Sequence, residues 1–470
     1  MMRKFIFVES LILLLAACTT AGTQSQSSHS TSPSQEESAL AGTQIAPPLP
    51  TPPPILLGDY ELLSPEDMRA DLNELFNTLE MTHPDLYAHR PKAEVDLERQ
   101  QIYADLDQPM TLVSYYLKVA PLVASLGDSH TAVALPVDAI DTKELYFPLF
   151  VEYQGQQAFI AANMGYADIQ PGAELLEING IPISIILNDL PSFSFFPNFM
   201  MSLWFLYGSI PEYQVELLNP GAQIPATYPV YGTTLEMLMQ RITESVDYSP
   251  PERLVYSTLP DENIGILTIN SFGGNMGQYL QPAFTQIQEE NVQHLIIDIR
   301  ANAGGMYDQV DSVMKYLTNQ PYRRCSIRYA RYVVDISISP REIECDLIQP
   351  LDIPLRFQGK LYLLIGPDTY SAAITFATIL QDYNLAILIG EETTAPASYC
   401  AYISDPVALP RTHLLYKCSV SCYIRPNGLY DERGVIPDVV VETTFQDRID
   451  GKDPALAYTL DMIRSHNPTP

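Results

Sequence analysis

The chain has 470 residues, with 26 basic and 56 acidic side chains and a formal net charge of -30. Hydrophobic residues make up 46% and charged residues 17%, a globular composition that excludes wholesale disorder. No run of Lys and Arg offsets the acidic charge, which excludes nucleic acid as a partner. At roughly 100–200 residues per domain, the length predicts several domains with enough chain to bury a core.

The N-terminus predicts export. Arg3 and Lys4 precede an apolar run over residues 5–15, which is typical of a secretory signal and too short to span a bilayer. Residues 15–18, Leu-Ala-Ala-Cys, resemble the bacterial lipobox, which implies that residues 1–17 are removed and Cys18 is lipidated. A conventional signal cleaved nearby is the alternative. Either interpretation predicts a protein exported from the cytoplasm.

A polar segment follows the signal. Residues 19–55 are rich in Ser, Thr, Gln and Pro, a composition that cannot form a core and stiffens towards polyproline geometry near its end. We expect residues 18–57 to be a tether that holds the folded part outside the cytoplasm, anchored in the bacterial cell envelope through the lipid on Cys18. The membrane is then a partner through this anchor alone.

Five further cysteines are consistent with an oxidising compartment. Cys325 and Cys345 could close one loop, while Cys400 could pair with either Cys418 or Cys422, which leaves one thiol over. A zinc site built from Cys418 and Cys422 is the alternative, but export favours disulfides. We therefore expect no bound metal.

The first predicted domain, residues 58–135, is helical. Ser64 precedes Pro65 and two acidic residues, the pattern of a helix N-cap, and leucines follow at helical spacing. Further helices are expected near residues 92–106 and 112–126. The domain ends in a polar loop that begins at Gly127.

The second predicted domain, residues 140–255, is rich in β-structure. Strands are expected at residues 147–153 and 157–161, and a third segment over residues 172–181 contains an Asn-Gly turn. Beyond residue 190 only scattered strands and one helix, near residues 233–245, can be assigned.

The third predicted domain, residues 256–470, alternates strands and helices. The expected strands cover residues 264–269, 295–299, 360–365 and 386–389. The expected helices lie near residues 277–290, 306–318, 371–383 and 453–464. This alternation predicts an α/β fold with mainly parallel strands and ligand sites at their carboxyl ends.

Two strand-end loops carry candidate chemistry. Ser371 follows the strand at residues 360–365 and opens a helix, where the positive end of the helix dipole favours an attacking oxyanion. Gly304 and Gly305 follow the strand at residues 295–299 and could present free N–H groups to an oxyanion. Read in isolation, Ser371 could also simply start a helix, and the two glycines could form an ordinary tight turn.

A serine nucleophile needs a base. Of the seven histidines, His130 is the best placed, because it lies in the polar loop over residues 126–131 that ends the third helix. The sequence contains no His-Glu-x-x-His motif, no P-loop and no dinucleotide fingerprint. We therefore expect no cofactor.

Taken together, these segments resemble the carboxyl-terminal processing and tricorn-core serine peptidases across roughly residues 60–460. The matching stretches, in chain order, are residues 126–131, 172–181, 298–305, 369–373, 389–393, 434–438 and 451–456. The resemblance implies a ClpP/crotonase-like α/β catalytic domain preceded by the helical domain and a degenerate, PDZ-like β domain. It also implies a peptide or protein substrate.

The resemblance assigns roles residue by residue. Ser371 matches the nucleophile, but Pro396 stands where the processing branch has its lysine base. The tricorn-like branch instead uses a Ser-His pair, matching Ser129 and His130, and a late acid. Asp431 or Glu432 could supply this acid: spacing favours the first and residue type the second.

The implied mechanism is acyl transfer. His130 would take the Ser371 proton, and Ser129 with the late carboxylate would orient the imidazole. The Ala372 N–H, with that of Gly304 or Gly305, would hold the oxyanion. The rival hypotheses are an exported binding module for peptides or hydrophobic ligands on the same fold, and a periplasmic scaffold.

Overall fold

The computed structural model describes residues 62–163, 166–190, 199–245, 252–331, 340–401, 406–430 and 432–466. The expected signal, the expected tether, Cys18 and Asp431 lie outside these residues. No helix within the described residues combines the length and the apolar character needed to cross a bilayer.

Three helices form the N-terminal part, as the sequence predicts: α2 (Pro65–Thr82), α3 (Lys92–Asp105) and α4 (Leu112–Ala124). The Ser64 hydroxyl accepts a hydrogen bond from the Asp67 N–H at 3.1 Å and so satisfies one of the open donors of the first turn. The apolar faces of the three helices share one buried cluster with Leu126 and Val133. A two-residue strand, β1 (Ala132–Val133), and a short 3-10 turn, η1 (Val137–Ala139), follow.

The middle part is built on an antiparallel sheet in the order β2-β3-β4-β6-β7, with β5 paired to β4. Its strands are β2 (Phe150–Gln154), β3 (Gln157–Ala162), β4 (Glu174–Ile178), β5 (Ile181–Pro182), β6 (Glu212–Leu218) and β7 (Ala226–Tyr231). Three helices accompany it: α5 (Ile183–Asp189), α6 (Phe199–Tyr207) and α7 (Leu235–Ser245). The sequence did not predict α6, whose residues are almost all apolar and therefore show no helical period. The PDZ-like character of this part stays a prediction.

The C-terminal part contains a six-stranded sheet in the order β19-β14-β13-β10-β9-β8. Its strands are β8 (Leu254–Leu259), β9 (Ile264–Ile269), β10 (His294–Asp298), β13 (Lys360–Ile365), β14 (Ile387–Gly390) and β19 (Val439–Val440). All neighbours are parallel except β8 and β9, which are antiparallel. Because β9, β10, β13 and β14 run the same way, the loops that follow them meet at one edge.

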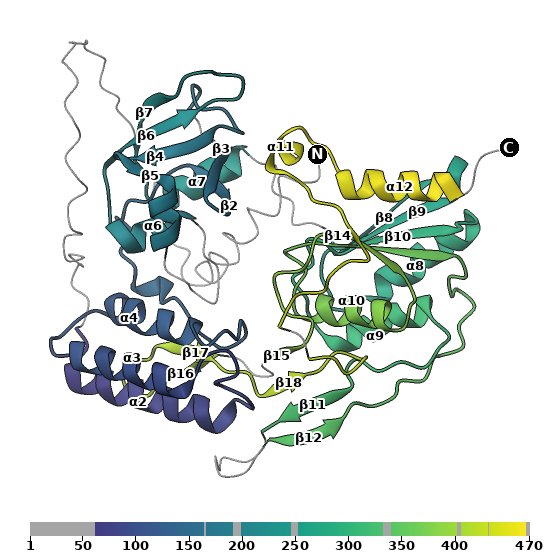
Figure 1. Ribbon diagram of the computed structural model, residues 1–470, viewed down its shortest axis with the longest axis horizontal. Helices are drawn as coiled ribbons and strands as arrows, with labels where there is room; N and C mark the ends of the chain where they lie inside the picture. The colour runs from purple at the N-terminus through teal and green to yellow at the C-terminus, as the bar shows by residue number, and fades with distance from the viewer. Residues whose placement is uncertain are drawn as a thin grey trace, which may run out of the picture.

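Helices cover both faces of this sheet (Figure 1). On one face lie α8 (Gly277–Glu289), α9 (Tyr307–Leu317) and α10 (Ala372–Asp382), and on the other lies α12 (Pro454–His466). Successive side chains of β10 point to opposite faces of the sheet. Leu295 and Ile297 pack in the core beneath α8, α9 and α10, and Ile296 packs in the core beneath α12. The predicted α/β class and mainly parallel pairing are confirmed.

An excursion after β14 links the C-terminal part to the helices at the start of the chain. It contains β15 (Tyr399–Ala401), β16 (Val407–Ala408), β17 (Leu415–Lys417) and β18 (Ser421–Tyr423), each too short for a periodic signal. Strand β17 pairs with β1, while β18 pairs with β15 and with the hairpin of β11 (Ile327–Ala330) and β12 (Arg341–Glu344). In Figure 1, β16 and β17 lie beside α3 and α4, far from the main sheet.

A buried carboxylate fixes this excursion. Oδ2 of Asp71, in the middle of α2, accepts hydrogen bonds from the N–H groups of Arg411 at 3.1 Å and Thr412 at 2.6 Å. Leu409 and Leu414 pack into the helical core on either side. The first and last parts of the chain are therefore joined by a packed interface, close to the loop that carries His130.

Two half-buried aspartates hold Arg300 at the end of β10. Its guanidinium bonds Asp298 and also Asp453, at 2.7 and 2.9 Å, in the turn before α12. Two short helices, η2 (Pro260–Glu262) and α11 (Phe445–Ile449), complete the C-terminal part. An exposed pair of similar chemistry, Arg464 with Glu262, joins α12 to η2.

We predict that Arg300→Ala lowers the free energy of unfolding by about 2–3 kcal/mol, because it leaves two partly buried carboxylates without their counter-charge. The measurement is the shift of the urea midpoint at neutral pH. The control is Arg464→Ala, which should shift the midpoint much less, because solvent screens that exposed pair. Equal costs for the two variants would contradict this prediction.

Candidate active site

The loop after β13 is fixed by hydrogen bonds from buried polar groups. The Thr369 hydroxyl donates to the Ile299 carbonyl at 3.0 Å and accepts from the Gly366 N–H at 3.1 Å. One residue later, the Tyr370 N–H donates to the Asn302 carbonyl at 3.0 Å. The loops after β10 and β13 are therefore cross-linked just before Ser371.

Ser371 has an unusual backbone conformation, with φ 54° and ψ -121°. A positive φ in a residue with a Cβ costs of order 1–3 kcal/mol and persists only where the surroundings enforce it. Ser371 occupies the N-cap of α10, yet its side chain makes no capping hydrogen bond. The hydroxyl is therefore not used to start the helix.

His130 faces this hydroxyl. Its Nε2 lies 3.2 Å from Ser371 Oγ, although 241 residues separate the two along the chain. His130 is buried, with 4% of the residue exposed. A hydroxyl and an imidazole in hydrogen-bond contact are the arrangement that general-base activation of a nucleophile requires.

Asp128 shapes the loop that carries His130. Its Oδ1 accepts from the His130 N–H at 3.0 Å, and its Oδ2 accepts from the Thr131 hydroxyl at 2.6 Å and contacts His83 Nε2 at 3.0 Å. Burial alone raises the pKa of Asp128, but the hydrogen bond and charge of His83, with the hydrogen bond from Thr131, hold that pKa at about 2. Asp128 is thus an anion at physiological pH.

Two aromatic rings flank the His130 imidazole. Tyr370 stacks on it with ring centroids 4.9 Å apart and Tyr399 with centroids 5.7 Å apart. Burial lowers the pKa of His130 below its ordinary 6.5, and Lys417 lowers it further, while Asp128 and a hydrogen bond to the Cys400 carbonyl act against them. The imidazole is therefore mostly neutral, and able to accept a proton, at pH 7.

The glycine loop lies against the nucleophile. A Cβ on Gly304 would lie 2.7 Å from Ser371 Cβ and 2.9 Å from the Ala372 nitrogen, so only glycine fits there. The Gly304 N–H donates to Asn302 Oδ1 at 2.8 Å. Within the described residues, the N–H groups of Gly305 and Ala372 have no protein acceptor. Of the two glycine alternatives in the sequence hypothesis, Gly305 is the one with an available donor.

The remaining candidates are placed differently. Ser129 Oγ accepts a hydrogen bond from the Tyr370 hydroxyl at 2.8 Å, beside the imidazole. Glu432 is not at the imidazole of His130: its carboxylate lies 3.6 Å from Nδ1 of His89, with 69% of the side chain exposed. The other acid candidate, Asp431, lies outside the described residues.

The cysteines resolve the pairing that the sequence left open. Cys325 is joined to Cys345, and Cys400 to Cys422, which leaves Cys418 as the free thiol. Burial and the nearby Asp128 charge raise the pKa of Cys418 to about 12, so it is a poor nucleophile. The second disulfide holds together β15 and β18, next to His130.

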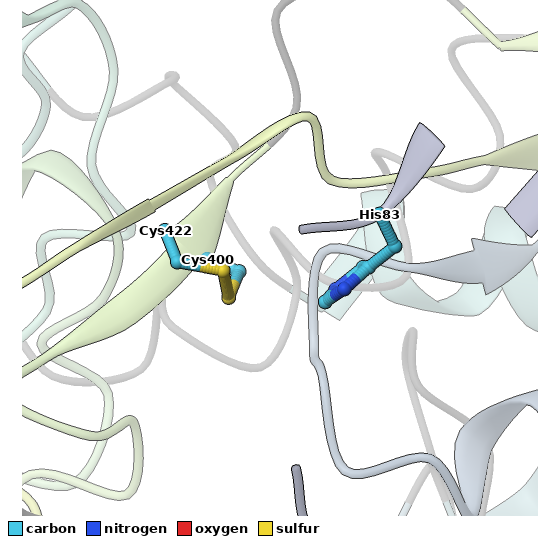
Figure 2. A group of neighbouring side chains, drawn as sticks. All are labelled: His83, Cys400 and Cys422. Atoms are coloured by element: carbon cyan, nitrogen blue, oxygen red, sulfur yellow. A yellow bond between two sulfur atoms is a disulfide. The ribbon is translucent and has the colours of Figure 1, made fainter. Parts of the chain in front are cut away.

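One cluster has the composition of a metal site: His83, Cys400 and Cys422 (Figure 2). Both sulfurs belong to the disulfide, so neither is a thiolate ligand. Both ring nitrogens of His83 are also engaged, Nε2 with Asp128 and Nδ1 with the Asp85 N–H at 3.0 Å. The chemistry of these donors does not fit zinc while the disulfide is intact.

Comparisons with known proteins agree with this geometry. Residues 263–441 match the model of peptidase family S41. The chain thus carries an S41 domain. A relative named "Probable CtpA-like serine protease", from Staphylococcus epidermidis, is 23% identical over 182 residues, or 38% of this chain and 34% of that protein. The carboxyl-terminal-processing protease of Synechocystis is 21% identical over 364 residues, covering 76% of this chain and 74% of that protein.

The fold outside residues 263–441 is also similar to that of a solved structure. A crystal structure of mature CPAF covers 86% of this chain and 99% of its own, with a TM-score of 0.63 and 15% identity. The similarity thus extends beyond the S41 domain to the helical and β-rich parts. The chain spans about a third of the length of the staphylococcal relative.

Sequence reasoning missed several residues that build the site. Asn302 is fully buried and binds Gly304 and the Ile269 carbonyl, at 2.8 and 2.9 Å. An asparagine two residues before a glycine in a strand-end loop was the available signal. The sequence has no comparable signal for Tyr370 and His83, because their roles depend on contacts with segments distant in sequence.

We predict that Gly304→Ala slows the reaction of Ser371 with a fluorophosphonate by about 100-fold or more. The new methyl group must displace the nucleophile or the start of α10, and a shift of about 1 Å is enough for a loss of this size. The measurement is the second-order labelling rate followed by mass spectrometry.

The matched control is Gly366→Ala in the neighbouring loop. A Cβ there would meet its nearest atom at 3.6 Å, which is ordinary contact. Its labelling rate should stay within about twofold of the wild-type rate. A Gly304→Ala variant that labels as fast as this control would contradict the packing argument.

Proposed function

We propose that this chain is an extracytoplasmic serine endopeptidase that cleaves peptide bonds with Ser371 as nucleophile and His130 as general base. The observation that carries the proposal is the 3.2 Å contact between His130 Nε2 and Ser371 Oγ. The S41 domain and the names of the curated relatives support the same reaction class.

The proposed reaction begins at the hydroxyl of Ser371. His130 Nε2 takes its proton while Oγ attacks the peptide carbonyl, and the imidazolium then gives that proton to the leaving amine. Water attacks the resulting ester by the same route in reverse. The neutral form of His130 is the active base, and its burial favours this form.

The negatively charged oxygen of the tetrahedral intermediate must be stabilised by hydrogen-bond donors. The Ala372 N–H directly follows the nucleophile, and the Gly305 N–H follows Gly304, which lies against Ser371, so both support this role. The N-terminus of α10 adds its dipole. A donor of this kind contributes about 3–4 kcal/mol to transition-state stabilisation. Ser129 remains a proposed further orienting group, and of the two late acids the proposal keeps Asp431, because Glu432 contacts His89 instead.

We predict that Ser371→Ala and His130→Gln each reduce cleavage of a denatured protein substrate on the order of 10³-fold or more, because each removes one half of the nucleophile–base pair. Product peptides are quantified by mass spectrometry. The controls are Ser312→Ala on α9 and His294→Gln at the start of β10, which should retain the wild-type rate. Ser371→Ala at the wild-type rate would overturn the proposal.

We further propose that the protein is anchored to the bacterial cell envelope by a lipid on Cys18. The basic residues Arg3 and Lys4, the apolar run and the Leu-Ala-Ala-Cys segment support this. The polar, proline-rich residues 18–57 would then be a tether, and the disulfides are consistent with an oxidising compartment.

Expressed in a bacterium grown with radiolabelled palmitate, the full chain should carry label and remain with the membrane fraction. Cys18→Ser should lose both properties, because the thiol is the acylated group. The control is Cys418→Ser, which should keep label and location. Equal labelling of Cys18→Ser and the wild-type protein would contradict the anchor.

A further inference from the structure

Tyr370 directly precedes the nucleophile and contacts both members of the early Ser-His pair. Its hydroxyl donates to Ser129 Oγ at 2.8 Å and lies 3.2 Å from His130 Nδ1. Its ring stacks on the imidazole with an interplanar angle of 15°. Its N–H is bound to the Asn302 carbonyl, so the backbone of this residue is fixed as well.

The hydrogen-bond directions select one tautomer of His130. A phenol has a single proton, and that of Tyr370 is donated to Ser129. Towards His130 the Tyr370 oxygen can then only accept, so Nδ1 must carry the proton. In a neutral imidazole Nε2 is then unprotonated and faces Ser371 Oγ as an acceptor.

We propose that Tyr370 is a positioning residue that holds His130 in the Nδ1–H tautomer and stabilises the imidazolium formed during the reaction. This inference rests on the proposed peptidase function but assigns a residue that the Ser-His-acid hypothesis does not contain. Tyr370 acts through His130: its oxygen accepts from Nδ1–H, and its ring restricts rotation of the imidazole.

Other groups face the same imidazole and enter the interpretation of any pH profile. Asp128 and Lys417 act through their charges, Tyr399 also stacks on the ring, and the Cys400 carbonyl accepts a hydrogen bond. Removing the Tyr370 oxygen leaves these groups in place. In the Nδ1–H tautomer the Cys400 carbonyl and the Tyr370 oxygen share one N–H, so the change removes one of two acceptors. The bond that is lost is stronger to the imidazolium than to the neutral ring.

The test is Tyr370→Phe in the full chain, which keeps the stacked ring and removes the oxygen. We expect kcat to fall on the order of tenfold with KM unchanged, and the acidic limb of the kcat/KM profile to move to lower pH. The matched control is Tyr256→Phe, which removes a hydroxyl bonded to Glu290 at 2.7 Å, away from the site. This control should behave as the wild-type protein does.

A second measurement does not depend on activity. With 15N-labelled histidine, the wild-type His130 ring should show the Nδ1–H tautomer at neutral pH, and Tyr370→Phe should show a smaller share of it, because one of the two acceptors of that N–H is gone. The His130→Gln variant assigns the signal. Failure of the peptidase proposal would appear as a wild-type protein that cleaves nothing, while the tautomer would still be measured.

An unchanged tautomer and an unchanged acidic limb in Tyr370→Phe would overturn the inference, even if kcat fell, because a purely structural defect would leave both in place. A wild-type His130 that carries its proton on Nε2 would also overturn it.

Discussion

The hydrogen bond between His130 Nε2 and Ser371 Oγ depends on the whole architecture, because its two members come from opposite parts of the chain. Ser371 is set by the sheet: the loops after β10 and β13 are cross-linked through Thr369 and Asn302. His130 belongs to the helical part, which reaches the sheet only through a packed interface. An error of about 1 Å between the two parts would separate nucleophile and base.

The excursion that carries β15–β18 makes this alignment possible. It pairs with β1, which begins two residues beyond His130, and it inserts apolar side chains into the helical core. The buried carboxylate of Asp71 also accepts a hydrogen bond from its backbone. It also brings Tyr399 and the Cys400 carbonyl to the imidazole. The Cys400–Cys422 disulfide joins the two strands that border the site, so its contribution is to hold the base as well as to stabilise the fold.

Many of the helices, strands and site residues can be predicted from the sequence. The others cannot, for physical reasons. The helices at the N-terminus and the strands β9, β10 and β13 have strong caps or apolar runs, and they lie close to their predicted positions. Ser371, His130 and the glycine loop could be named because strand ends and family motifs point to them. The short strands of the excursion, the role of Tyr370 and the engagement of the Gly304 N–H by Asn302 depend on contacts between distant segments, for which one sequence has no signal.

The pairing of Ser371 with His130 is best tested by the pH dependence of fluorophosphonate labelling at Ser371, which reports the nucleophile and its base without requiring a known substrate. We predict a rate that rises with pH along a single limb whose midpoint lies below 6.5, the ordinary pKa of histidine, because burial disfavours the charged imidazole. That limb should disappear in His130→Gln, which should label very slowly. A limb unchanged by that substitution, or labelling at a residue other than Ser371, would contradict the central claim.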